Sequence, residues 1–369
     1  AARGLLGLGA ATMMPATLAL IRITFSDERE RNTAIGVWAS VAVVGAALGP
    51  VVGGVLLEFF WWGSVFLINV PVVVAAIILT IAVAPPNMPN PTKHWDAPSS
   101  LYALVTLASL VTAIKELANP ARTWWLLLAA VVLTVVGAIL FTRRQQRLDD
   151  PLLTFDVFRS RIFTGGVLAA AGAMFAVSGL ELLTTQRFQL VLGYSPLEAG
   201  LLVTAVTLAA LPFARLGGAV LPRVGFIPLI AGGFAVVAAG VGLATWAGND
   251  HVLPLFVVGL ALVGAGAGSI MSVSSTAIIG SAPVRRAGMA AGVESVSYEF
   301  GTLLAVSVLG SLLPVLYALR ARPGTELDGA AYDTAYLTIL LVIAVIAAAF
   351  AILSAWCFRG NPRSPGATQ

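Results

Sequence analysis

The stretch LPLFVVGLALVGAGAGSIMSVSSTAII (Leu253–Ile279) decides the fold, because all 27 of its residues lack a charged side chain. A helix needs about 20 predominantly apolar residues to cross the hydrocarbon core of a bilayer. Helices of water-soluble domains are apolar on one face only. The stretch therefore predicts a membrane-spanning helix.

The rest of the chain repeats this character. Of its 369 residues, 59% are hydrophobic and only 10% are charged, whereas about a quarter are charged in a typical soluble domain. We therefore expect an all-α, polytopic membrane protein with about eleven transmembrane helices. The expected spans are Gly4–Ile21, Ala34–Leu56, Val65–Val83, Ser99–Leu117, Trp124–Thr142, Phe163–Leu183, Ala199–Leu216, Ile227–Ala247, Leu253–Ile279, Met289–Tyr317 and Thr334–Phe358.

The net charge of +4 follows from this topology. If the linker after the first expected span is cytoplasmic and the sides alternate, most of the 21 Lys and Arg residues lie on the cytoplasmic side. This excess agrees with the positive-inside rule and places the C-terminus in the cytoplasm. The basic balance thus gives no reason to expect a nucleic-acid partner. The single cysteine, Cys357, excludes a disulfide within the chain and a cysteine-based metal site.

Two glycine-rich patterns are relevant to the energy source. No GxxxxGK[ST] phosphate loop occurs, which argues against ATP as the direct energy source. The sequence GAGAGS (264–269) lies within an expected span and follows no strand. Close helix packing is the favoured interpretation of GAGAGS, because glycines let backbones approach one another. A nucleotide-binding loop is the alternative.

The second expected span contains GAALGPVVGG (Gly45–Gly54). Gly45, Gly49 and Gly53 recur every four residues and share a helix face, while Pro50 removes a backbone donor and bends the helix. The pattern fits either a tight helix crossing or a bend that controls leakage. It resembles the antiporter motif in the fifth helix of drug:proton antiporters of the major facilitator superfamily.

Other segments extend this resemblance over nearly the whole chain. The segment RGLLGLGAATMMPATLALIR (Arg3–Arg22) resembles the fourth helix of these antiporters, and WWGSVFLINVP (Trp61–Pro71) resembles the start of the sixth. The sequence FQLVLGYSPLEAGL (Phe188–Leu201) resembles a later landmark of the fourteen-helix branch. The resemblance is to QacA-type multidrug pumps, with the eleven spans matching helices four to fourteen. We therefore expect the chain to lack helices one to three.

This resemblance implies a major facilitator fold and a function. QacA-type pumps export lipophilic cationic drugs, quaternary ammonium compounds and dyes in exchange for protons. The expected protein is a monomer in the cytoplasmic membrane, without a cofactor and without enzymatic activity. The implied divisions are the rest of the N-terminal bundle (1–83), two extra helices with cytoplasmic loops (84–160), the C-terminal six-helix bundle (161–358) and a cytoplasmic tail (359–369).

Two carboxylates, Glu294 and Glu299, lie inside the expected span Met289–Tyr317. A charge at the bilayer centre costs about 2.5–3.5 kcal/mol on the insertion scale, so such acids face a cavity, pair with a base or bind a proton. The two acids are about 140° apart around a helix and should not form a dyad. Tyr298, one turn after Glu294, can hydrogen-bond it. Structural acids that bond neighbouring helices are the alternative.

The resemblance assigns roles to these residues. It implies proton coupling by Glu294 and Glu299, cation binding by both acids with Tyr298, and a part in proton transfer for Arg3. The chain departs from QacA-type pumps at Ser295, where such pumps can carry an acid. It departs likewise at Ala210, where one pump has an aspartate, so the substrate range stays open.

Glu181 is a third acid within a span, expected at the outer mouth of the substrate site. Its alternative role is a structural pair with Arg187. Phe175 and Phe213 are further candidates, beside Tyr298, for cation–π contact with a substrate.

Two other functions stay open at this point. The chain can be a truncated, transport-incompetent membrane protein, or an exporter of a specific antibiotic. A channel is less well supported, because no ring-forming filter segment is apparent in the sequence.

Overall fold

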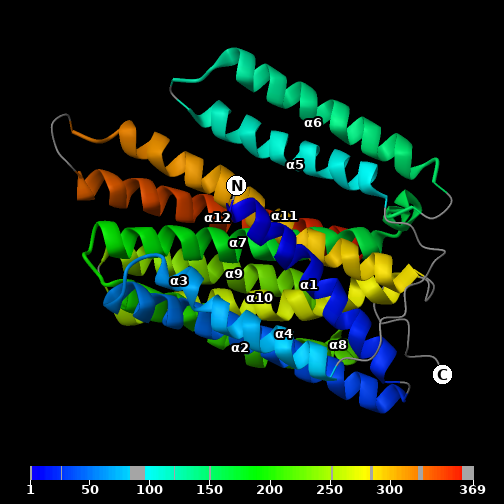
Figure 1. The fold of residues 1–369 in the computed structure, drawn as a ribbon. Coiled ribbons are helices and arrows are strands. Elements are labelled where there is room, and N and C mark those ends of the chain that lie inside the picture. Colours follow the sequence, from blue (N-terminus) through cyan, green and yellow to red (C-terminus); the bar gives the residue numbers. More distant parts are fainter. Residues whose placement is uncertain are drawn as a thin grey trace. The chain divides into compact units, whose positions relative to one another are not determined.

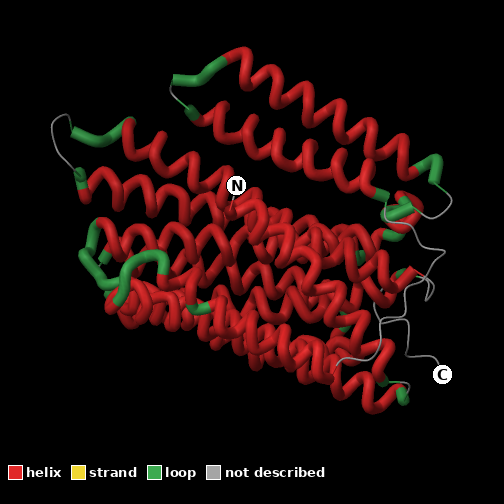
Figure 2. Tube along the Cα trace, viewed as in Figure 1, coloured by secondary structure: helices red, strands yellow, loops and turns green. Residues whose placement is uncertain are grey.

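The computed structural model describes residues 2–25, 27–83, 96–119, 121–148, 151–250, 252–282, 286–322 and 327–359. Within these ranges the chain is helical apart from short turns, and it contains no strand (Figure 2). The helices are α1 (Ala2–Thr24), α2 (Glu28–Phe59), α3 (Ser64–Leu67), α4 (Asn69–Val83), α5 (Ala97–Ala118), α6 (Trp124–Gln145), the 3-10 helix η1 (Phe155–Arg159), α7 (Arg161–Leu190), α8 (Pro196–Val224), α9 (Phe226–Asn249), α10 (Leu253–Ser281), α11 (Ala287–Ala318) and α12 (Gly329–Cys357).

The predicted all-α membrane architecture is confirmed. Among the described residues, nine helical segments are long and apolar enough to cross a membrane: the α3–α4 segment and each helix from α5 to α12. They coincide with nine of the eleven expected spans. The other two expected spans, 4–21 and 34–56, lie within α1 and α2, where only part of the side chains is described.

The chain forms two compact units, residues 1–94 and 95–369. In the first unit α1 contacts α2, and α2 leads through α3 to α4. No residue of α4 is buried, although this helix is apolar over almost its whole length. An apolar helix with exposed side chains is what a lipid-facing span requires.

The second unit is a bundle of α7 to α12 with an added helix pair. α10 contacts α7, α8, α9 and α11, while α12 packs on α7, α9 and α11. α5 and α6 lie side by side, and α5 packs on α11 (Figure 1). α11, the helix that carries Glu294 and Glu299, thus contacts both the other bundle helices α7, α10 and α12 and the added helix α5.

The glycines of GAGAGS bring helix backbones into contact. A Cβ atom added at Gly264 or Gly268 collides with a backbone oxygen of α8, that of Val206 or Ala210 respectively. A Cβ added at Gly266 collides with the backbone oxygen of Gly233 in α9. The prediction of close helix packing at GAGAGS is therefore confirmed, and α10 is wedged between α8 and α9.

Candidate functional site

The candidate site centres on α11, which is apolar apart from its two acids and a few small polar residues. One face of α11 packs on α7, where Ala305 and Leu309 are fully buried. On the same face Gly301 allows close approach, because an added Cβ would collide with the backbone oxygen of Ala171. A hydrogen bond of 3.1 Å joins the hydroxyls of Thr302 and Ser178 across the two helices.

Glu294 lies at the boundary between α11 and α10. The Tyr298 hydroxyl donates to Glu294 Oε1 over 3.0 Å, so the bond predicted from their spacing is confirmed. The same hydroxyl lies 3.3 Å from the backbone oxygen of Met271 in α10. A phenol has one proton to donate, so these two acceptors share it. Glu294 is half-buried there, with its carboxylate tied through Tyr298 to a neighbouring helix.

Glu299 has different surroundings. Its side chain is exposed, as is that of Ser295 one turn earlier. The difference agrees with the expected angle of about 140° between the two acids around the helix. The structure therefore separates one acid that has a defined hydrogen-bond donor from one on an open face of the second unit.

The alternative pairing of Glu181 with Arg187 is wrong. Arg187 Nε donates to Asp333 Oδ1 of α12 over 2.7 Å, and Arg187 Nη2 donates to the backbone oxygen of Gly248 in α9 over 3.2 Å. Glu181 and Arg187 are six residues apart in α7, whereas helix neighbours are three or four apart. Glu181 itself is partly buried in α7.

Arg187 anchors a buried polar cluster that the sequence did not reveal. Its side chain is 2% exposed, and its guanidinium lies 4.9 Å from the ring centre of Tyr336. The Tyr336 hydroxyl is 3.0 Å from that of Thr184. Asp333 was missed because the linker was expected to run to that residue, whereas α12 begins at Gly329. The available signal was Arg187 itself, since a base next to an apolar span needs an acid.

In the first unit the predicted residues are only partly described. Arg3 belongs to α1, but its side chain lies outside the described part. Pro50 lies inside α2, Gly45 and Gly49 are exposed, and Gly54 is buried. A Cβ added at Gly45, Gly49 or Gly53 meets no described atom within 4 Å. The described part of this unit thus shows no tight helix crossing at these glycines.

The aromatic candidates are dispersed. Phe175 packs against the main hydrophobic core, and Phe213 on α8 is 45% exposed. Tyr298 alone among the three hydrogen-bonds a predicted acid, within the described residues. It is therefore the aromatic residue best placed to act together with a carboxylate.

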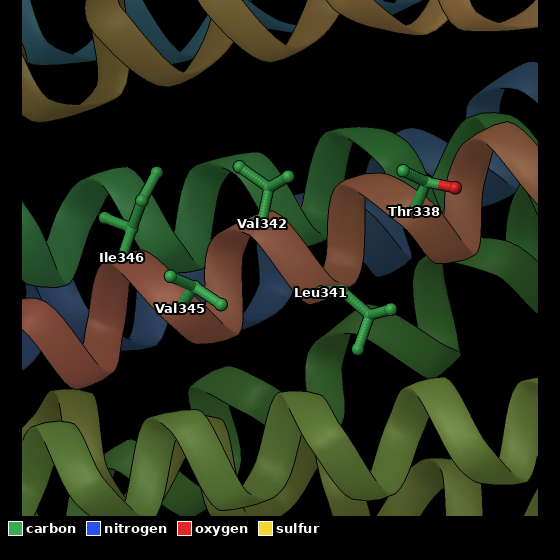
Figure 3. A pocket seen from close by; sticks show the side chains of 5 residues that line it. All are labelled: Thr338, Leu341, Val342, Val345 and Ile346. Carbon is green, nitrogen blue, oxygen red and sulfur yellow. The ribbon is translucent and has the colours of Figure 1, made fainter.

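A shallow pocket of about 300 Å³ lies along α12 (Figure 3). Its lining is apolar apart from Thr338, whose hydroxyl donates to the Thr334 backbone oxygen over 2.6 Å. No predicted site residue lines the pocket, and an apolar groove on a single span suits lipid chains better than a charged substrate. The lining residues are Thr338, Leu341, Val342, Val345 and Ile346.

The charged pairs outside the spans have ordinary electrostatic causes. Arg144 donates to both carboxylate oxygens of Asp96, and this bond lowers the pKa of Asp96 to about 2. Arg286 Nη1 donates to Asp156 Oδ2 over 2.6 Å and lowers the pKa of that carboxyl. Among the described residues no group of three or more His, Cys, Asp or Glu side chains is placed to hold a metal ion.

Comparison with known proteins gives consistent results. The family model described as Major Facilitator Superfamily matches residues 1–180 and 162–369. The methyl viologen resistance protein SmvA of Salmonella typhimurium is 36% identical over 323 residues, which cover 87% of this chain and 65% of SmvA. The multidrug efflux pump LfrA of Mycolicibacterium smegmatis is 34% identical over 321 residues, which cover 86% of this chain and 62% of LfrA. The chain thus spans less than two thirds of the length of these relatives.

A solved structure shares the fold. It is the crystal structure of a bacterial homologue of the human lysosomal transporter Spinster, in an inward-facing and unoccupied conformation. The TM-score is 0.56 at 17% sequence identity, covering 95% of this chain and 76% of the other. At this identity the likeness concerns the fold alone.

Proposed function

The chain belongs to the major facilitator superfamily, and from that premise we propose that it serves proton-coupled export of lipophilic cations such as quaternary ammonium compounds and dyes. Relatives in this family carry the names of efflux and resistance proteins. The proposal adds the charge of the substrate and the proton as the coupling ion.

The bond between Tyr298 and Glu294 carries the proposal. A carboxyl inside an apolar helix is costly to keep and marks a functional site. Such a group can release a proton and then attract a cation. The adjacent tyrosine supplies both a hydrogen-bond donor and an aromatic face, which favours flat or quaternary cations. Methyl viologen, named in one relative, is a flat cation of the kind that such a site would attract.

The remaining assignments belong to the same proposal. Glu299 is the second coupling acid, and Glu181 contributes to the outer mouth of the substrate site. Arg3 takes part in proton transfer, and the motif Gly45–Gly54 forms the bend that limits leakage. The proposed state is a monomer in the cytoplasmic membrane with a cytoplasmic C-terminus and the QacA-type order of helices.

The test is proton-driven efflux of ethidium by the complete protein reconstituted in vesicles. Glu294→Gln and Glu299→Gln are each expected to abolish efflux that depends on a proton gradient. Glu198→Gln is the matched control, because Glu198 occupies the third position of a capping box at the start of α8 and Gln can take that role. Unchanged efflux in both acid variants at normal expression would sink the proposal.

A substrate panel separates the other candidates. Export of a neutral antibiotic without export of ethidium would indicate an exporter of one antibiotic. No transport of either compound by a correctly inserted protein would indicate a transport-incompetent membrane protein.

A further inference from the structure

The linker between α6 and α7 bonds both the end of α6 and the residue before α11. We call residues Leu153–Phe158 the strap. Its first residue bonds the end of α6, since Leu153 N donates to Gln145 Oε1 over 3.1 Å. Three residues later Asp156 forms an ion pair with Arg286, which immediately precedes α11. The strap therefore connects the α5–α6 pair to the start of the acid-bearing helix.

The α6 end of the strap is firmly held. Gln145 is 2% exposed and Ser99 is fully buried. Gln145 Nε2 donates to Ser99 Oγ over 2.6 Å, and Ser99 Oγ donates to the Asp96 carboxylate. Asp96 in turn takes the two-pronged bond from Arg144. Hydrogen-bonded polar networks rigidify the structure around them, and the two members nearest the strap, Gln145 and Ser99, are buried, so the α6 end of the strap is held in place.

The α11 end has both polar and apolar contacts. Thr154 contacts the Met289 sulfur through its backbone N at 3.4 Å and its hydroxyl at 3.3 Å. Arg286 Nη1 also reaches the Thr154 hydroxyl at 3.4 Å. Arg286 immediately precedes α11 and Met289 lies in its first turn, so both contacted residues come before the first acid of the helix.

A small apolar cluster continues from the strap to the candidate site. Val157 is buried in this cluster with Ala290 of α11 and Ile278 of α10. Phe158 packs against the same cluster, and so does Tyr298, the donor to Glu294. The strap thus lies in one packed unit with the residue that positions the Glu294 carboxylate.

We propose that Leu153–Phe158 sets the position of the first turns of α11 against α10, so that Asp156 and Arg286 are positioning residues for Glu294. The effect of the strap on transport rests on the proposed function, whereas its effect on the position of Glu294 does not. Neither residue touches substrate. The ion pair acts through Met289 and the apolar cluster, and it holds the carboxylate within reach of the Tyr298 hydroxyl.

The geometric part is tested by labelling a cysteine at the site. Glu294→Cys is introduced into a Cys357→Ala background, and its reaction rate with a water-soluble maleimide is measured in the complete protein. Arg286→Gln is expected to raise this rate by about two- to fivefold, the range that corresponds to an exposed ion pair. The rate at Glu299→Cys should not change, because that residue lies on another face.

Two further variants control this measurement. Arg147→Gln removes the same charge from the exposed turn that follows α6, and it should leave the rate at Glu294→Cys unchanged. Asp156→Arg combined with Arg286→Asp reverses the pair and should restore the original rate. If Arg286→Gln leaves the rate unchanged, or the reversed pair fails to restore it, the strap is not a positioning element.

An ethidium efflux assay provides a second test of the strap. Arg286→Gln is expected to raise the KM for ethidium about two- to fivefold without lowering the maximal rate. An unchanged KM in this variant contradicts the positioning role. If the unaltered protein moves no dye, the proposed function fails, and the labelling still decides about the strap.

Discussion

At one end of the second unit Arg187 and Asp333 form an ion pair whose side chains are 2% and 23% exposed. At the other end Arg286 and Asp156 form a pair whose side chains are 41% and 54% exposed. The first pair joins two spans, and its guanidinium also reaches the backbone of a third. The second pair joins a linker to the start of one span.

The difference concerns what each pair can tolerate. A buried charge that loses its partner is left desolvated, whereas an exposed charge returns to water. The Arg187 pair therefore fixes the ends of α7, α9 and α12 as a unit. The Arg286 pair can be broken at small cost, which suits the positioning role that we propose for it. In the predicted topology the fixed end is the outer one.

The largest expected effect is the loss of stability when the buried cation Arg187 is removed. Arg187→Gln leaves Asp333 without its cation, and we expect the free energy of unfolding to fall by about 3 kcal/mol, at the low end of the range for buried pairs because Asp333 is partly exposed. Thermal unfolding in detergent, followed by tryptophan fluorescence, measures this loss.

Arg286→Gln is the matched control, because it makes the same chemical change at the exposed pair. Its melting temperature should stay close to that of the unaltered protein. Equal shifts in melting temperature for Arg187→Gln and Arg286→Gln would show that the buried and the exposed ion pair contribute equally to stability, which contradicts the difference in their exposure.

A smaller loss of stability is expected when the hydrogen bond beside Arg187, between Tyr336 and Thr184, is removed. Tyr336→Phe removes the bond to the Thr184 hydroxyl and leaves a buried polar group unpaired, which should cost about 1–2 kcal/mol. Tyr332→Phe is the control, because the buried Tyr332 hydroxyl has no hydrogen-bond partner among the described residues. Its loss should be neutral or stabilising. A larger loss of stability in Tyr332→Phe than in Tyr336→Phe would contradict the hydrogen bonding described for this cluster.

The fold was predictable because its determinants are local. Each span needs only its own apolar length, as Leu253–Ile279 illustrates, and GAGAGS needs only glycine to permit close packing. The bond between Glu294 and Tyr298 was predictable for the same reason, since the two residues are one helical turn apart. In each case the deciding feature lies within one short segment of the sequence.

The two ion pairs were not predictable in this way. Arg187 meets Asp333, 146 residues later in the chain, and Asp156 meets Arg286, 130 residues later. Their pairing depends on how antiparallel spans return to the same end of the bundle. Closeness in sequence suggested Glu181 as the partner of Arg187, but α12 supplied the acid.

The smallest expected effect concerns pH at the exposed pair. The bond from Arg286 holds the pKa of Asp156 below its usual range. A lowered pKa in the folded state means that the pair persists above the ordinary aspartate value of about 3.9 and is lost only as the pH falls through the lower folded value. Between pH 8 and pH 5 the Asp156 carboxyl therefore stays ionised.

Asp156→Asn should raise the KM for ethidium, yet leave the shape of the efflux profile over this range unchanged. The pKa of the Asp96 carboxyl is about 2, so Asp96→Asn should likewise leave the shape of the efflux profile between pH 8 and pH 5 unchanged. A profile that flattens in either variant would show that the substituted carboxyl titrates between pH 5 and pH 8, which contradicts its lowered pKa.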